Sequence, residues 1–117
     1  MVKKYDIVVV NFDPARGAEK RGVRPALILQ NNKVNQSKIE TVIVVPLTNT
    51  PKDVPSAVWI IASKENGLKS DSRLEISQLR MIDRRRISKT LGTLEPKYYK
   101  DISEKVTNFL DLNDEYL

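Results

Sequence analysis

Short apolar runs alternate with polar loops along the first half of the chain. The runs at 6–12, 24–30, 41–48 and 56–62 are rich in Val, Ile and Leu and are bounded by turn-forming residues. This pattern predicts β-strands, because β-branched and apolar residues favour a pleated surface and Pro, Gly, Asp and Asn end it. The run at 41–48 is almost wholly apolar, so we expect both faces of its strand to be covered, with a bulge or a sheet edge near Pro46.

Two further segments change this pattern. Residues 73–83 alternate with period two until the alternation slips at Ser77 and Gln78, which predicts one strand with a bulge. Residues 95–112 place apolar side chains at helical spacing, with Pro96 in the first turn, and predict an amphipathic helix packed on the sheet. The polar residues 31–40 are expected to be connecting chain. The expected apolar face of the helix consists of Tyr99, Ile102, Val106, Phe109 and Leu110.

These elements indicate an α+β, mostly β fold: a small antiparallel barrel or barrel-like sheet followed by one C-terminal helix. The chain has 117 residues, a length that suits one hydrophobic core, so we expect a single domain over 1–117. Among the aromatic residues, Phe12 and Trp59 are expected to lie in that core.

The charge is unevenly distributed along the chain. There are 20 basic and 15 acidic residues, a net charge of +5, and residues 1–91 hold 17 of the basic but only 9 of the acidic ones. A basic body suits a polyanion such as nucleic acid or an acidic peptide, although many cationic surfaces serve only solubility. The run "DRRR" at 83–86 is open to the same two interpretations, a solvated turn or a phosphate contact.

The chain contains neither cysteine nor histidine. Disulfides and thiolate metal sites are therefore excluded, a reducing cytoplasm is the simplest location, and any catalysis must use carboxylates, hydroxyls, lysines or arginines. No apolar stretch approaches the roughly 20 residues that span a bilayer, and the N-terminus lacks the pattern of a signal peptide. No metal site is indicated, since the carboxylates, Glu75 among them, show no ligand spacing.

The segment "EKRGVRPALILQNN" places a cation, Arg24, at the start of an expected buried strand. Its guanidinium could stabilise an anionic ligand, or it could cap the barrel edge by pairing with Glu19. Thr48 ends the third apolar run and could offer its hydroxyl to a ligand, although threonine is ordinary at a strand end. Gln78 and Arg80 alternate on one face of their expected strand, so they point either to solvent or into a groove.

Three longer stretches carry a family resemblance. They read "YDIVVVNFDPARGAEKRGVRPALIL", "VIVVPLTN" and "SQLRMIDRRRISKTLGTL", in this order. Together they resemble the MazF/PemK family of toxins from type II toxin–antitoxin pairs, over nearly the whole chain. The most specific parts are residues 13–26 and the "PLT" element that ends at Thr48. Departures from the family pattern occur at Tyr5, Asn11 and Ser77, none of which belongs to the implied catalytic pair.

The resemblance implies an SH3-like or CcdB-like barrel that forms a homodimer and cleaves single-stranded RNA at short preferred sequences, without a metal or another cofactor. The implied attack by the ribose 2′-hydroxyl leaves a 2′,3′-cyclic phosphate and a 5′-hydroxyl. In the family the arginine of "RPA" and the threonine of "PLT" are catalytic, which gives Arg24 and Thr48 here, with Glu19 as the base or as the group that orients Arg24. The implied partner is a cognate antitoxin with an acidic, disordered inhibitory segment. Contacts to RNA are expected from Arg16, Lys20, Arg21, Asn49, Gln78 and Arg80.

Two other functions remain open from the sequence. A CcdB-like toxin would share the barrel but would bind DNA gyrase and cut nothing. A plain nucleic-acid-binding barrel would stack bases on exposed aromatic side chains. The chain has few aromatic residues, and Phe12, Trp59, Tyr99 and Phe109 are expected in the core or on the packed helix face. The plain nucleic-acid-binding barrel is therefore ranked below the endoribonuclease and the CcdB-like toxin.

Overall fold

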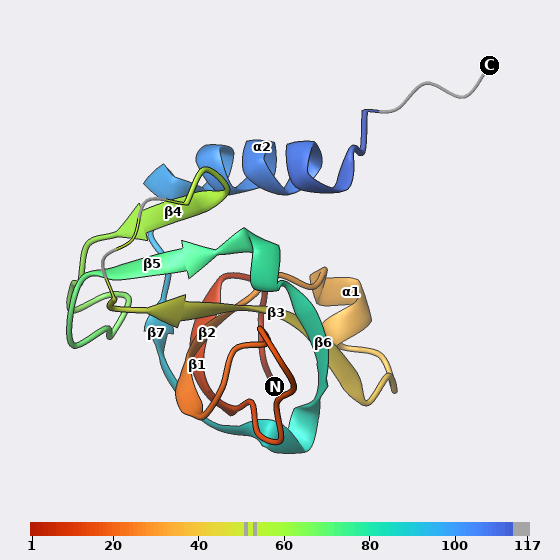
Figure 1. Cartoon of the computed structure of the whole chain (residues 1–117). Helices are drawn as coiled ribbons and strands as arrows, with labels where there is room; N and C mark the ends of the chain where they lie inside the picture. Colours follow the sequence, from red (N-terminus) through yellow and green to blue (C-terminus); the bar gives the residue numbers. More distant parts are fainter. Residues whose placement is uncertain (51, 53, 114–117) are drawn as a thin grey trace.

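The structure, a computed structural model, describes residues 1–50, 52 and 54–113 (Figure 1). No helix in these residues is both long and apolar enough to cross a membrane. The strands are β1 (Asp6–Asn11), β2 (Val23–Ile28), β3 (Thr41–Thr48), β4 (Ala57–Ile60), β5 (Ser72–Glu75), β6 (Arg80–Asp83) and β7 (Ile87–Thr93). The α-helices are α1 (Asn32–Asn35) and α2 (Tyr99–Leu110), and the 3₁₀ turns are η1 (Ile76–Gln78), η2 (Arg84–Arg86) and η3 (Pro96–Tyr98).

All strand pairs are antiparallel, and the sheet runs in the order β4-β5-β3-β2-β1-β7. β3 is the longest strand, and along one edge its first half pairs with β6 while its last two residues pair with β5. In Figure 1 the strands curve around a common centre, with β4 and β5 beneath α2. The predicted small, mostly β antiparallel fold with a C-terminal helix is thus confirmed.

β3 is covered on both faces, as its apolar sequence predicts. Val42 and Val44 belong to one buried cluster, whereas Val45 and Leu47 belong to a second cluster. Pro46 marks neither a bulge nor a sheet edge. It pairs with Ala26 of β2, and on the other side of β3 it lies between the residues that pair with β6 and those that pair with β5.

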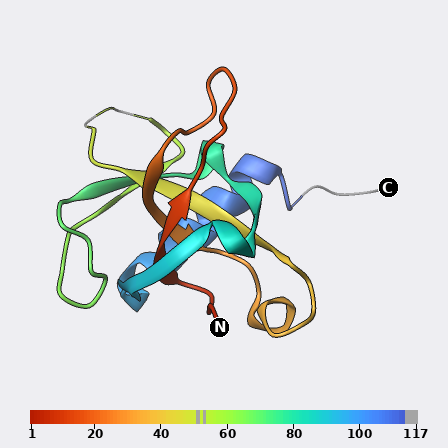
Figure 2. The same cartoon turned by 90° about the horizontal axis from the view of Figure 1, so that it is seen from below.

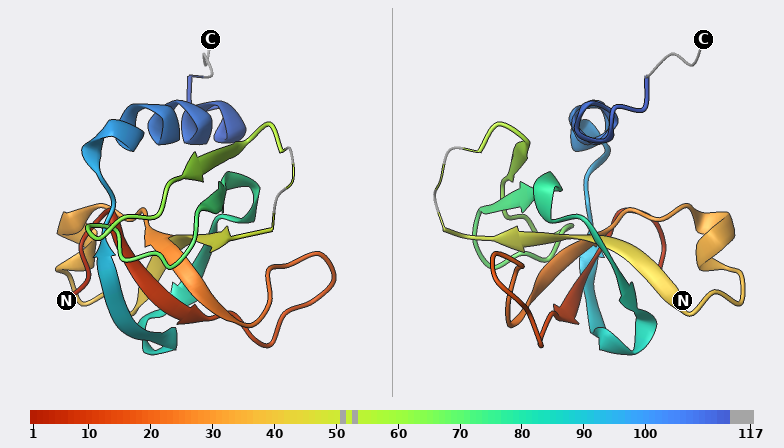
Figure 3. Two further views of the ribbon diagram at one scale, coloured as in Figure 1. Left: turned by 90° about the vertical axis from the view of Figure 1, so that its left-hand side faces the viewer. Right: turned by 45° about the vertical axis from the view of Figure 1, so that its right-hand side comes forward.

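α2 packs on the second cluster and lies across one end of the sheet (Figure 3). Ile102 is fully buried, and the ring of Tyr99 stacks on that of Tyr5 with the centroids 3.6 Å apart. Val106 packs against the same core. Phe109, in contrast, is 49% exposed, so the predicted apolar face of the helix is buried only as far as Val106.

Three segments differ from the sequence prediction. Residues 73–83 form two strands, because the chain turns through η1 after Glu75 and β6 then pairs with a different part of β3. Residues 87–93, for which the sequence predicts no strand, form β7 beside β1. The segment expected to be connecting chain contains α1, which begins after Asn31, whose side chain accepts the N–H of Lys33 at 2.7 Å.

Trp59 lies at the surface with 46% exposure, whereas Phe12 is fully buried as predicted. The reason is the position of Trp59 on β4, a strand at the edge of the sheet whose residues alternate between two faces. Val58 and Ile60 take the positions that face the core. The expectation that Trp59 belongs to the core is therefore wrong.

Candidate active site

Strand register brings Arg24 of β2 and Thr48 of β3 together. The ladder between these strands ends with Ala26 opposite Pro46, and Arg24 and Thr48 each lie two residues beyond this last pair, on the same faces of their strands as Ala26 and Pro46. Residues that oppose each other in an antiparallel pair carry their side chains on the same face. Both residues line one pocket of about 490 Å³.

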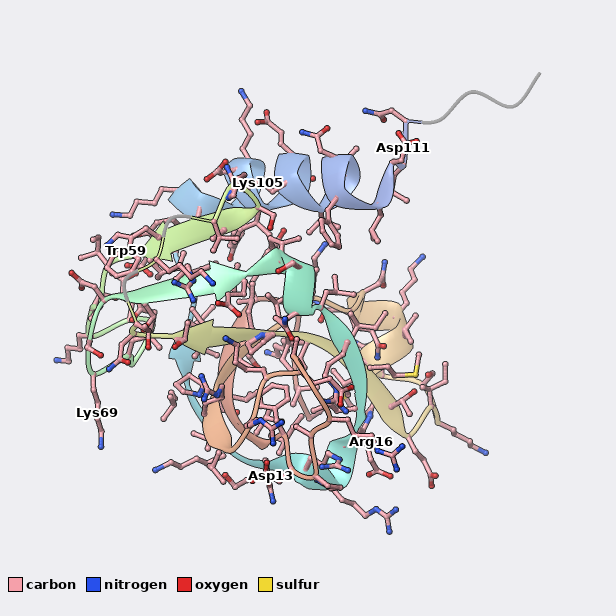
Figure 4. The ribbon with its side chains drawn as sticks, in the orientation of Figure 1. Asp13, Arg16, Trp59, Lys69, Lys105 and Asp111 are labelled. Carbon is pink, nitrogen blue, oxygen red and sulfur yellow. The ribbon has the colours of Figure 1, made fainter. Side chains whose placement is uncertain are left out.

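This pocket is basic. Arg24, Lys69 and Lys89 line it, and no Asp or Glu is among its lining residues in the described part of the chain. Lys89 belongs to β7, whereas Lys69 lies in the loop between β4 and β5 and points outward in Figure 4. Asn49 and Ser70 add polar groups. A set of hydrogen-bond donors without a carboxylate suits an anionic ligand.

The Arg24 guanidinium is oriented by a hydrogen bond within its own segment. Its Nε donates to the carbonyl oxygen of Arg21 at 2.8 Å, and the residue is half-buried. Arg24 forms no ion pair among the described residues. The Glu19 carboxylate instead accepts the backbone N–H of Arg16 at 2.5 Å, so the alternative of an Arg24–Glu19 cap is not what the structure holds.

Thr48 ends β3 and has only 9% of its surface exposed. Its hydroxyl oxygen accepts the N–H of Thr50 at 3.4 Å, which holds the following backbone close to the strand end. The hydroxyl can still donate its own hydrogen to a ligand. A metal ion has no comparable site, since residues 1–50, 52 and 54–113 contain no group of three or more His, Cys, Asp or Glu side chains placed to hold one.

The loop between β1 and β2 is fastened to the chain that follows β5. The backbone N–H of Lys20 donates to the side-chain oxygen of Gln78 at 3.2 Å, and the side-chain amide of Gln78 donates to the carbonyl oxygen of Ala18 at 3.3 Å. The ammonium of Lys20 lies 2.6 Å from Glu75. Lys20 and Gln78, both predicted RNA contacts, thus hold the loop, which projects from the barrel in Figure 2.

The remaining predicted site residues lie outside the pocket. Arg16 and Arg21 are exposed on the β1–β2 loop, where Figure 4 labels Arg16. Arg80 lies on β6 with its guanidinium carbon 5.8 Å from the centroid of the Phe12 ring, and its Nη1 is buried without a hydrogen-bond partner in the described chain. The predicted site residues that the structure brings together in the pocket are Arg24, Thr48 and Asn49.

The arginines of η2 bind mainly within the molecule. Arg84 and Arg86 donate to backbone carbonyl oxygens of other segments. Arg85 pairs with Asp83 at 2.9 Å, and its side-chain hydrogen bond, followed by that of its backbone N–H, lowers the pKa of Asp83 to about 2. The structure therefore favours the turn interpretation of this stretch over that of a phosphate contact.

The sequence prediction missed two sets of residues near the site. Lys69 and Lys89 line the pocket, and Arg73 and Glu75 are buried on β5, where Arg73 Nε donates to Glu75 at 3.0 Å. Burial alone would raise the pKa of Glu75, but hydrogen bonds from Lys20 and Arg73 outweigh it and hold that pKa below its usual value. The spacing of Arg73 and Glu75 in the sequence could have indicated that their side chains interact, because residues i and i+2 of a strand share a face.

Sequence comparison now places the chain in a family. A model described as "PemK-like, MazF-like toxin of type II toxin-antitoxin system" matches residues 3–110. The chain is 30% identical over 115 residues to Endoribonuclease MazF of Staphylococcus saprophyticus, and the match covers 97% of this chain and 94% of that protein. The chain therefore belongs to the PemK-like, MazF-like toxin family.

Solved structures show the same fold. MazF from Deinococcus radiodurans matches with a TM-score of 0.81 and 23% identity, over 94% of this chain and 96% of that one. An endoribonuclease from a mycobacterial species, in complex with its cognate antitoxin, matches with a TM-score of 0.77 and 19% identity, over 96% of this chain and 97% of that one. Together with the family match, these comparisons do not favour the alternative of a gyrase-binding toxin.

Proposed function

We propose that residues 1–117 form a single toxin domain that acts as a metal-independent endoribonuclease on single-stranded RNA at short preferred sequences. The observation that carries this proposal is that Arg24 and Thr48 line the same basic pocket. Membership of the toxin family supports it, as does the similarity to a protein named Endoribonuclease MazF.

In the proposed reaction, the 2′-hydroxyl oxygen of a ribose attacks the adjacent phosphorus. A base takes the hydroxyl proton, a bond forms between O2′ and phosphorus, and the bond from phosphorus to O5′ breaks while O5′ gains a proton. The products are a 2′,3′-cyclic phosphate and a 5′-hydroxyl. Negative charge builds on the non-bridging phosphoryl oxygens during this exchange, so fixed cationic donors lower the barrier.

Arg24 is assigned to those oxygens, because its guanidinium stays charged and its planar donors match phosphate geometry. We also assign it a hydrogen bond to the leaving O5′, which takes its proton from solvent, while Thr48 donates a hydrogen bond to a phosphoryl oxygen. Glu19 is kept as the proposed base. It does not line the pocket, so this assignment requires the Glu19 carboxylate to leave the N–H of Arg16 and reach the ribose.

The proposed RNA path crosses the pocket and continues along the β1–β2 loop. Lys69 and Lys89 are added to the proposed contacts, since exposed cations beside the reacting phosphate neutralise its neighbours. In this scheme Lys20 and Gln78 shape the path through the loop that they hold. The full set of proposed contacts carried from the sequence is Arg16, Lys20, Arg21, Asn49, Gln78 and Arg80.

The test is cleavage of a long RNA by the purified protein, with cut sites mapped by primer extension. We expect cutting at a few defined sequences in the presence of EDTA, and no cutting where a single 2′-deoxynucleotide replaces the nucleotide that carries the attacking hydroxyl. Arg24→Ala protein, purified in parallel, controls for contaminating ribonuclease. Cleavage at the deoxy-substituted position would contradict the chemistry, and loss of all cleavage in EDTA would contradict metal independence.

We further propose that an antitoxin inhibits the protein by laying an acidic, disordered segment over the basic pocket. A mycobacterial endoribonuclease of the same fold is described in complex with its cognate antitoxin, which supports this proposal. Coexpression of the reading frame next to this gene should relieve growth arrest, and the purified partner should stop RNA cleavage. A partner that binds with equal affinity to wild type and to a Lys69→Gln/Lys89→Gln variant would contradict a charge-based block of the pocket.

The active form is proposed to be a homodimer, as the family resemblance implies. Light scattering at micromolar concentration should give twice the 13.4 kDa mass of one chain. A mass of one chain under these conditions would contradict the proposal.

A further inference from the structure

The buried charges of β5 have no part in the proposed reaction. Arg73 and Glu75 are 5% and 6% exposed. Leu74 and Ile76 alternate with them and belong to the apolar core, so the two charged side chains lie on the opposite face of the strand. Charged residues are almost never buried this deeply unless they are paired.

Glu75 connects two separate segments of the chain. Its Oε2 lies 2.6 Å from Nζ of Lys20, in the β1–β2 loop. Its Oε1 accepts from Nε of Arg73 at 3.0 Å, and Nη1 of Arg73 donates to the carbonyl oxygens of Thr50 and Lys52 at 2.7 and 3.3 Å. One carboxylate therefore ties the β1–β2 loop to the segment that follows β3.

Each tied segment carries one half of the proposed catalytic pair. Lys20 lies in the β1–β2 loop, which leads into β2 and Arg24, and Thr50 comes shortly after Thr48 in the chain. Thr48 also faces Arg73 directly in the ladder between β3 and β5. The β1–β2 loop and the segment after β3, which adjoin the pocket in the chain, cannot separate without breaking one of these charge-assisted hydrogen bonds.

We propose that Glu75, held between Lys20 and Arg73, is a positioning residue that fixes Arg24 relative to Thr48 without touching the RNA. This inference rests on the proposed ribonuclease function. Apolar side chains often replace a buried ion pair without loss of stability, so stability alone is a weak reason for the cluster. Apolar side chains could not hold the backbone carbonyl oxygens that Arg73 binds.

The test removes one interaction of the cluster at a time and leaves Glu75 with a cationic partner. Arg73→Lys keeps a cation beside Glu75 but loses the guanidinium donors to the backbone, whereas Lys20→Met removes the ion pair between the loop and Glu75, leaves the loop's bonds to Gln78 in place, and keeps Arg73 paired. We expect each variant to lower kcat by about 10- to 100-fold, since a small misplacement of a catalytic group has an effect of this size. KM should stay within about twofold in Arg73→Lys, because its ground-state contacts to RNA are unchanged, whereas Lys20→Met, at a proposed RNA contact, should lower kcat whether or not its KM also rises.

Asp83→Asn is the matched control. It removes a carboxylate that pairs with Arg85 at 2.9 Å, but on the surface, and it should leave kcat unchanged. Combination with Arg24→Ala separates positioning from a general loss of structure. If the cluster acts through Arg24, the Arg73→Lys/Arg24→Ala double variant should lose less activity than the product of the two single losses.

Unchanged kcat in folded Arg73→Lys and Lys20→Met proteins would overturn the inference. A raised KM with unchanged kcat in Lys20→Met would also overturn it, because Lys20 would then act only as an RNA contact. Circular dichroism would check folding, and Lys20→Met decides the question if Arg73→Lys does not fold, since the Lys20 side chain is 20% exposed and less confined. A wild-type protein that cuts no RNA would refute the proposed function instead, which keeps the two failures distinct.

Discussion

Two groups of charged side chains in and around the candidate site differ in burial and in pairing. The members of the first group, the ion cluster, are buried or half-buried and each contacts an opposite charge. The members of the second group, the pocket cations, line an open cavity and have no carboxylate partner among the described residues. The ion cluster consists of Lys20, Arg73 and Glu75, and the pocket cations are Arg24, Lys69 and Lys89.

The difference shows which charges hold the protein and which are available to a ligand. A buried charge has lost its hydration and needs a fixed partner, so the side chains of the ion cluster form their hydrogen bonds with other groups of the protein. A pocket cation keeps water as its partner and can exchange that water for a phosphate oxygen. We therefore expect substitutions in the two groups to change different properties.

The largest effect is expected for Arg24→Ala. Loss of a preorganised donor to the developing charge should lower the rate of RNA cleavage by on the order of 10²–10³. The protein should remain folded, because Arg24 is half-buried and forms no ion pair in the described chain. Single-turnover cleavage of a short RNA that contains one mapped site would measure the loss.

Arg24→Lys is the matched variant for this prediction. It retains the positive charge but lacks the planar fork of donors, so it should recover only part of the lost rate. Full activity in folded Arg24→Ala would remove Arg24 from the catalytic pair, and full activity in Arg24→Lys would show that charge alone is sufficient.

A smaller effect is expected at Thr48. Thr48→Val removes the hydroxyl at nearly constant shape, and the loss of one neutral hydrogen bond should slow cleavage by about tenfold. Thr48→Ser keeps the hydroxyl and should stay close to wild type. Equal losses in both variants would show that Thr48 contributes packing at the end of β3 and not a hydrogen bond to the substrate.

The next effect concerns the two pocket lysines that the sequence analysis missed. Lys69→Gln and Lys89→Gln should each weaken RNA binding by a few fold and lower the slope of log K against log salt by about 0.7, the value for one phosphate contact on a single strand. Fluorescence anisotropy at several salt concentrations measures this slope. Lys33→Gln on α1, outside the pocket, makes the same charge change and should leave the slope unaltered.

Local sequence patterns predicted most of the strands but not all of them. The runs at 6–12 and 41–48 are strongly apolar because their strands are buried, so the pattern in the chain reflects the core directly. β7 carries exposed polar side chains on an edge of the sheet, which leaves no clear alternation to detect. The split of 73–83 into two strands depends on which part of β3 each one meets, and this information lies outside the segment itself.

The site was predictable to a similar extent. Arg24 and Thr48 stand in short, distinctive elements of the toxin family, so the sequence alone singled them out, although it did not show that they line one pocket. The role of Lys20 depends on Glu75, which is far away in the chain and meets it only after folding. The sequence next to a charged residue does not indicate whether its partner in the folded protein will be a ligand or another residue.

The smallest effect is expected at Asp83, where a short ion pair lies at the surface. The side-chain hydrogen bond from Arg85 lowers the pKa of Asp83 from 3.8 to about 2. Because the folded-state pKa lies below the unfolded one, the ionised carboxylate contributes stability above pH 3.8 that is lost as the pH falls toward 2. Asp83→Asn should therefore melt slightly below wild type at pH 7, with a gap that closes in acid and shrinks in high salt. Glu75→Gln, which leaves buried cations without their carboxylate, should melt far lower at pH 7. Equal losses in these two variants would show that pairing alone, and not burial, distinguishes the ion cluster from other charges.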